Sequence, residues 1–180
     1  MSNTNNKLLI ENIYTNIIRS SRNKSFFLDF RVDDSVEGRF DIIILHSFMI
    51  FNFFIHINDK KSQLPQLLFD HMFTDIENNL RELGYGDIAV NKRMKQFIKA
   101  FYSRITNYSK SISELNELGD DTLLKETILR NIYKDKKIDD RCIDFWRNYI
   151  INNLEYINAR TLKENLDNFF MFKINSNYGK

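Results

Sequence analysis

The segment that most constrains the fold of this chain covers residues 39–57, the most apolar stretch of the sequence. At 100° per residue, Asp41, Asn52 and His56 fall on one narrow stripe of a helix, and apolar side chains occupy nearly all of the rest. Such a helix is buried either in a protein or in a bilayer. Polar side chains interrupt its apolar runs, whereas a membrane span needs about 20 mostly apolar residues. We therefore predict the buried central helix (about 36–57) of a soluble domain.

The composition favours a single helical domain. With 180 residues, 43% of them hydrophobic, and 16 phenylalanines, the chain can bury a sizeable core. Five glycines and one proline are few for a turn-rich sheet protein. We expect one domain over residues 1–180, an all-α irregular bundle of about six to seven helices around the central helix, with 174–180 as a loose tail.

Net charge, cysteine content and the first residues bear on the partners, the cross-links and the location of the protein. The formal net charge of +2 argues neither for nor against a nucleic-acid partner. The single cysteine, Cys142, excludes an internal disulfide and a cysteine zinc site, and its place on an expected buried face indicates an inert thiol. The N-terminal residues lack the patterns of a secretory signal and of a transit peptide, so we expect a cytoplasmic protein.

Apolar residues at helical spacing predict the other helices. The expected helices are about 7–22, one from near Leu64 to a stop at Gly84, about 90–111, one opened by Asp120 or Asp121, one opened by Asp139 or Asp140, and a short one that Thr161 caps through a T-x-x-E box. Residues 24–34 form a short connection that can be extended, and 58–62 a polar turn. Both glycines of the sequence GYGD, Gly84 and Gly86, can take positive φ in a tight turn.

No constellation of side chains predicts catalysis or a metal site. A di-iron bundle needs paired Glu-x-x-His motifs, which the three histidines do not supply. His46 lies on an apolar face, and we interpret it as a hydrogen-bonded core histidine. Asp70, Asp75 and Glu77 are close in sequence, but Asp75 points away from the other two, and acid–base chemistry needs groups that converge. We therefore expect neither an enzyme nor a metal or cofactor.

The strongest electrostatic feature is a basic stripe, Lys92, Lys95 and Lys99, on one side of a predicted helix. Arg93 and Arg104 lie to one side of it. A solvated helix face explains three lysines as well as a functional surface does. The functional interpretation is a docking surface for phosphate backbone, acidic lipid head groups or an acidic protein partner.

Two blocks of sequence, DDSVEGRFDIIILHSF (33–48) and LFDHMFTDIENNLRELGYGDIAVNKRMKQFIKAFYSR (68–104), resemble the ubiquinol–cytochrome c chaperone family. The GRFD…LH start, the LFD-x-M-x-x-D core, the LRE-x-G-x-GD turn and the K-x-x-K…AFY-x-R run occur in order at the expected spacing. The resemblance covers about residues 8–108 well and the rest loosely. The usual proline-rich ending of the family does not occur here.

The resemblance implies an all-helical, non-enzymatic assembly factor for the cytochrome bc complex (respiratory complex III). In mitochondria, family members bind newly made cytochrome b near the ribosomal tunnel exit, together with a small partner protein. A peripheral contact with the inner membrane fits this role, and DNA is not an expected partner. The matching positions are Arg39, Phe40, Asp41, His46, Asp70, Asp75, Arg81, Gly84, Gly86, Asp87, Lys92, Lys95, Phe101, Tyr102 and Arg104.

These matches define the candidate partner-binding residues, although Gly84, Gly86 and Phe101 are structural whatever the function. The candidates are Arg39, Asp41, His46, Asp70, Asp75, Arg81, Asp87, Lys92, Lys95, Tyr102 and Arg104, with Arg93 and Lys99 added from the basic stripe.

Two other functions stay open at this point. One is a carrier that lodges a quinone or acyl chain between the central helix and its neighbours. The other is an enzyme that acts through His46 and a carboxylate, which requires His46 to face a pocket.

Overall fold

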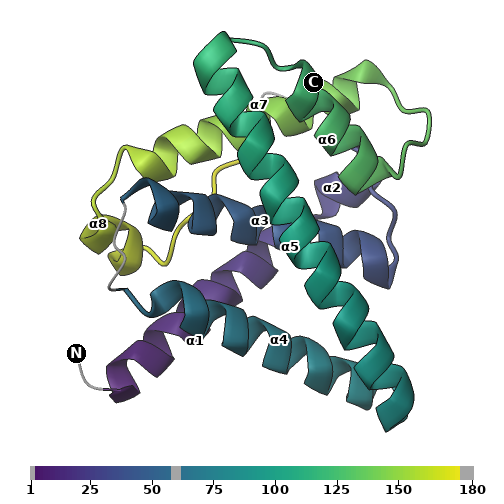
Figure 1. The fold of residues 1–180 in the computed structure, drawn as a ribbon, viewed down its shortest axis with the longest axis vertical. Coiled ribbons are helices and arrows are strands. Elements are labelled where there is room, and N and C mark those ends of the chain that lie inside the picture. Colours follow the sequence, from purple (N-terminus) through teal and green to yellow (C-terminus); the bar gives the residue numbers. More distant parts are fainter. Residues whose placement is uncertain (1–2, 58–61, 175–180) are drawn as a thin grey trace.

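A computed structural model describes residues 3–57 and 62–174, and their side chains from Asn6 onward. These residues form eight helices and no strand (Figure 1). The helices are α1 (Asn3–Ser21), α2 (Lys24–Leu28), α3 (Val36–His56), α4 (Leu64–Glu82), α5 (Asp87–Leu118), α6 (Thr122–Tyr133), α7 (Asp140–Asn158) and α8 (Leu162–Asp167). The predicted all-α bundle is confirmed. The expected turn at 58–62 and tail at 174–180 lie almost wholly outside the described residues.

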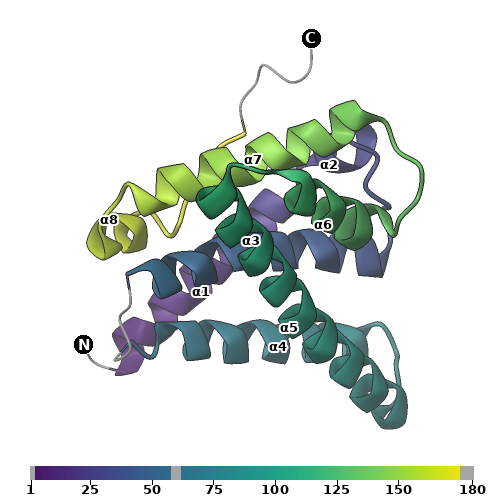
Figure 2. The same cartoon turned by 45° about the horizontal axis from the view of Figure 1, so that its top comes forward.

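Helix α3 forms the centre of the bundle, as its sequence predicts. It packs against α1, α5, α6 and α7. Figures 1 and 2 show α7 and α1 on opposite sides of α3, α4 beyond α1, and the long helix α5 crossing over α3. Among the described residues, α3 alone is long and apolar enough to cross a membrane, and 72% of its most apolar window is buried inside the protein. Neighbouring helices thus cover the surface that a bilayer would otherwise have to cover.

The start of α3 is defined by a side-chain cap and a close backbone approach. The Ser35 hydroxyl accepts a hydrogen bond from the Gly38 backbone N–H at 3.1 Å. A Cβ atom at Gly38 would overlap the carbonyl oxygen of Asp33. The glycine of the GRFD motif is therefore required by the packing of the chain that enters α3.

The connection at 24–34 differs from the expectation of an extended segment, because residues 24–28 form the helix α2. Asn23 caps this helix by accepting a hydrogen bond from the Ser25 N–H at 2.9 Å. Phe26 is fully buried, and Phe30 stacks on Phe145 of α7 with ring centroids 3.4 Å apart. The segment ties α1 to the core through Phe26 and Phe30, as predicted.

The turn between α4 and α5 is the tight connection predicted from GYGD, with one correction. Gly84 has φ of 86°, but Gly86 has φ of −71° and is the N-cap of α5, so only one of the two glycines uses the left-handed region. Helix α5 also extends beyond the predicted 90–111 at both ends and stops at Gly119, where φ is 71°. Its 32 residues span about 48 Å.

His46 is a buried core histidine, as interpreted from the sequence. Its Nδ1 lies 2.8 Å from the carbonyl oxygen of Ile42, and its Nε2 lies 2.8 Å from the hydroxyl of Tyr149 on α7. Because a carbonyl can only accept, Nδ1 carries the proton and Nε2 accepts from Tyr149. His46 is fully shielded from solvent, and this burial lowers its pKa from 6.5 to about 4.

This burial predicts a loss of stability in mild acid. The unfolded chain binds a proton on His46 near pH 6.5, whereas the folded chain resists it until about pH 4, so acid favours unfolding in this window. We expect the free energy of unfolding to fall by about 2 kcal/mol from about pH 7 to about pH 5 through this residue. Urea unfolding of a His46→Gln variant should show a smaller pH dependence, and His56→Gln, at an exposed position, should keep it. An unchanged slope in His46→Gln would contradict the assignment.

Candidate functional site

A groove runs beside the N-terminal half of α3, where α1, α3 and α4 meet. It has a volume of about 180 Å³. Its apolar lining comes from three helices and from Phe97 of α5. The apolar lining residues are Ile18, Val36, Phe40, Ile43, Ile76, Leu80, Leu83 and Phe97. Phe40 of the GRFD motif packs on Phe97, with ring centroids 4.3 Å apart. The first sequence block of the resemblance therefore forms part of the wall of this groove.

Charged and polar side chains border the groove on both sides. Arg39 pairs with Asp34, with Nε 2.6 Å from Oδ1, and its guanidinium lies 5.5 Å from the ring centroid of Phe27. Asp75 accepts a hydrogen bond at 2.8 Å from the hydroxyl of Tyr14 on α1. Burial, together with the negative charge of Asp75, raises the pKa of Tyr14. Arg39 and Asp75 are the two predicted candidates that the fold brings together at this groove.

The groove continues into apolar side chains that solvent reaches. Val36 is 44% exposed and Leu83 is 65% exposed, and both line the groove. Exposed apolar side chains that border an apolar groove with a polar rim are typical of docking surfaces for protein segments. Leu83 continues the apolar face that Ile76 and Leu80 form on α4, so helical periodicity alone does not reveal its exposure.

Asp41 and Arg104 were candidates for partner contact, but the structure buries Asp41 and pairs it with a half-buried Arg104. Arg104 Nη2 lies 2.7 Å from Asp41 Oδ1, and Lys134, directly after α6, pairs with the other carboxylate oxygen. Burial raises the pKa of Asp41 even though Arg104 and Lys134 favour its charged form. Arg104 is therefore not part of the basic stripe. With His46 it belongs to the interior, where these side chains connect α3 to α5, α6 and α7.

Ion pairs hold the elbow between α4 and α5 together. Arg81 pairs with Glu77, with Nη2 2.8 Å from Oε1, and across the turn with Asp87. Arg93 lies 4.5 Å from the ring centroid of Tyr85, with its Nη1 3.4 Å from Glu37 at the start of α3. Arg81, Asp87 and Arg93 therefore position the turn next to the groove.

The remaining candidates are exposed. Asp70 accepts a hydrogen bond from Gln66 at 2.7 Å on the surface of α4. Lys92, Lys95 and Lys99 are exposed along α5, and the ion pairs found in the described part of the chain do not include them. Tyr102, also exposed, packs on Phe69 with ring centroids 5.6 Å apart. The basic stripe is thus a set of free cations beside an aromatic surface.

No side-chain cluster in the described residues has the composition of a metal site, since none gathers three or more His, Cys, Asp or Glu side chains. His46, the histidine on which the enzyme hypothesis depended, has the hydroxyls of Tyr149 and Ser21 and the backbone carbonyl of Ile42 as partners rather than a carboxylate, and it faces no solvent. The arrangement of groove, rim and free lysines suits binding to a macromolecule.

Comparison with known proteins identifies the family of the chain. The family model described as ubiquinol-cytochrome C chaperone matches residues 28–167. Two curated relatives, the mouse and human proteins named ubiquinol-cytochrome c reductase complex assembly factor 1, are each 22% identical over 153 residues, which is 85% of this chain and 50% of the relative. The chain thus spans about half the length of these relatives.

A solved structure supports the same grouping. The crystal structure of the Cbp3 homolog from Brucella abortus matches with a TM-score of 0.79 and 25% sequence identity, and the match covers 94% of this chain and 91% of that one. The family match, which covers most of the chain, and this shared fold lead to one conclusion: the chain belongs to the ubiquinol-cytochrome c chaperone family.

Proposed function

We propose that this chain is a non-enzymatic assembly chaperone of the cytochrome bc complex, and that it binds newly made cytochrome b. Membership of the family and the names of the mouse and human relatives support a role in the assembly of this complex. The observation that carries the binding role is the groove beside α3, because it leaves Val36 and Leu83 exposed at its edge. A groove of this kind suits an apolar helical segment of a membrane protein that has not yet entered the bilayer.

The groove stabilises such a client by covering its apolar surface. Each Å² of apolar surface removed from water contributes about 25 cal/mol. Several apolar side chains of the groove are partly open, and a client segment would bury them together with its own. The charged rim, with Arg39 and Asp75, would remain in water and orient the segment.

The basic stripe offers a second contact, which we assign to the ribosome. Free lysines that neutralise phosphates gain affinity from counterion release, so their binding weakens as salt rises. Lys92, Lys95 and Lys99 have this character, and Tyr102 beside them provides an aromatic surface for a small partner protein. A cytoplasmic location, with peripheral contact at the inner membrane, follows from this role.

The carrier hypothesis has less support in the described cavities. Pockets for small ligands are mostly apolar and usually enclose about 300–1,000 Å³. The apolar groove beside α3 has only about 180 Å³. A second cavity beside α3, of about 370 Å³, has amide, hydroxyl, imidazole and carboxylate groups in its wall. The groove is too small, and the wall of the second cavity too polar, to favour a quinone or an acyl chain.

A Leu83→Lys variant tests the groove. Leu83 is exposed, so the fold should tolerate lysine, but the charge removes an apolar contact, and client affinity should fall about tenfold. In cells that lack the wild-type gene, the variant should restore less complex III than the wild type does, with the other respiratory complexes unchanged. The matched control is Leu118→Lys, at a leucine that is 73% exposed at the far end of α5. Normal complex III with Leu83→Lys would rule out the groove as the client site.

Charge reversal of Lys92, Lys95 and Lys99 to glutamate tests the second contact. We expect this triple variant to unfold at the same urea concentration as the wild type, because the three side chains are exposed and form no ion pair with another described residue. Co-sedimentation with ribosomes at low salt should be lost. A triple reversal at exposed lysines elsewhere, Lys136, Lys137 and Lys163, should keep it. Equal co-sedimentation of all three proteins would show that the stripe is only a solvated face.

A further inference from the structure

The groove beside the N-terminal half of α3 has the size of one aromatic side chain. Its volume is about 180 Å³. An apolar cavity of about 150 Å³ in another protein binds benzene, so the groove has room for a single ring system rather than for a whole helix. Phe40 and Phe97, with ring centroids 4.3 Å apart, form part of its wall together with Ile43 and Leu80. A client helix that lies on the groove would therefore insert one bulky side chain into it.

A carboxylate in the wall restricts which side chain can enter. Asp75 lines the groove and is half-buried, and its Oδ2 accepts a hydrogen bond from the Tyr14 hydroxyl at 2.8 Å. The ring of Tyr14 packs edge-on against His71, with ring centroids 5.2 Å apart, so the hydroxyl that orients Asp75 is itself held in place. A carboxylate offers about four acceptor sites, and one hydroxyl fills only one of them.

A client in the groove leaves the outer part of Asp75 in water but covers the part that lines the groove. A charged group that loses water without gaining a hydrogen-bond donor costs free energy. A leucine or phenylalanine side chain over the carboxylate would incur this cost, whereas a side chain with an N–H or O–H group would offset it. The preferred occupant therefore combines a large apolar surface with a donor.

Two guanidinium groups at the same groove disfavour a basic donor and favour an aromatic one. Arg22 and Arg39 both line the groove. They repel the ammonium group of a client lysine, whereas a guanidinium is attracted to the face of an aromatic ring, most strongly to that of tryptophan. Arg39 already lies 5.5 Å from the ring centroid of Phe27. Tryptophan combines a large apolar ring with an indole N–H that only donates, so it meets every requirement of the groove.

We propose that the groove binds a tryptophan side chain of the client, with the indole ring against Phe40 and Phe97 and its N–H donating to the Asp75 carboxylate. The tryptophan anchor rests on the proposed function, since it belongs to the apolar segment that the groove binds. Tryptophan is enriched where membrane-spanning helices meet the two surfaces of the bilayer. A client helix that has not yet entered the bilayer thus presents tryptophan next to its apolar stretch, and the exposed Leu83 at the groove edge contacts that stretch.

The test is an NMR titration of the isotopically labelled full chain with three capped pentapeptides, Ser-Ala-X-Ala-Ser, in which X is tryptophan, benzothienylalanine or leucine. Benzothienylalanine has the shape of tryptophan with sulfur in place of the N–H group. Without the hydrogen bond to the carboxylate, it should bind about tenfold more weakly than tryptophan does. The backbone amide signals of Phe40 and Asp75 should shift.

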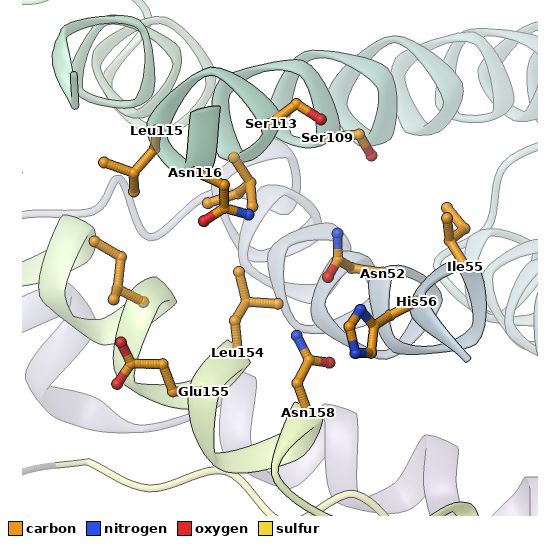
Figure 3. A pocket seen from close by; sticks show the side chains of 12 residues that line it. Asn52, Ile55, His56, Ser109, Ser113, Leu115, Asn116, Leu154, Glu155 and Asn158 are labelled. Atoms are coloured by element: carbon orange, nitrogen blue, oxygen red, sulfur yellow. The ribbon is translucent and has the colours of Figure 1, made fainter. Parts of the chain in front are cut away.

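The second cavity beside α3 serves as the internal control for this titration. Its wall contains the side-chain amides of Asn52, Asn116 and Asn158, at the other end of the helix from the groove (Figure 3). These three amide signals should stay in place while those of the groove shift. Equal binding of the tryptophan and benzothienylalanine peptides, or shifts at the second cavity instead of the groove, would overturn the proposal.

A paired substitution identifies the acceptor. Tyr14→Phe with Asp75→Leu removes both partners of one hydrogen bond, so neither partner is left unsatisfied and the fold should be kept. This double variant should bind the tryptophan and benzothienylalanine peptides equally. Glu126→Leu, which removes an exposed carboxylate on α6, should keep the preference of about tenfold. A preference for tryptophan that survives in the double variant contradicts the role of Asp75.

Failure of the tryptophan anchor and failure of the proposed function give different results. If all three peptides bind the groove equally and Leu83→Lys still lowers complex III in cells, the anchor is wrong and the groove remains the client site. If the tryptophan peptide binds the groove selectively and Leu83→Lys leaves complex III normal, the anchor is supported and its occupant does not come from the proposed client.

Discussion

The structure depends on covering an apolar helix on nearly every side. Helix α3 cannot be half-solvated, because apolar side chains occupy most of its circumference, and burying them is the main gain in free energy on folding. Four helices from distant parts of the chain therefore converge on it. The two ends of α3 are where that cover is incomplete, and the groove and the polar cavity lie there, with Val36 near one and His56 near the other.

Polar groups inside this apolar core specify how the helices are placed. Asp41 forms ion pairs with Arg104 of α5 and with Lys134 at the end of α6. His46 accepts a hydrogen bond from Tyr149 of α7. An unpaired charge or imidazole in such a core costs several kcal/mol, so each of these pairs favours one packing of the helices over others. Part of the sequence block that resembles the family thus serves the architecture, and the part that reaches the surface, near Arg39, borders the groove.

Sequence patterns predicted the helices far better than they predicted the sites. Periodicity and capping residues located α3, α4 and the Thr161 box, since these depend on residues close in the chain. The pairing of Asp41 with Arg104 and the exposure of Leu83 depend on how helices distant in sequence pack against one another. Periodicity alone groups Arg104 with the basic stripe and Leu83 with the apolar face of α4. The short helix α2 was missed because its five residues show no helical period.

The claim that the groove binds cytochrome b is tested most directly by crosslinking in the cell from either of two exposed leucine positions. A photo-reactive phenylalanine analogue is placed at residue 83, at the edge of the groove, or at residue 118, at the far end of α5, and captured proteins are identified. We expect residue 83 to capture cytochrome b during its synthesis and residue 118 not to capture it. Capture of cytochrome b from residue 118 alone, or from both positions equally, would contradict it.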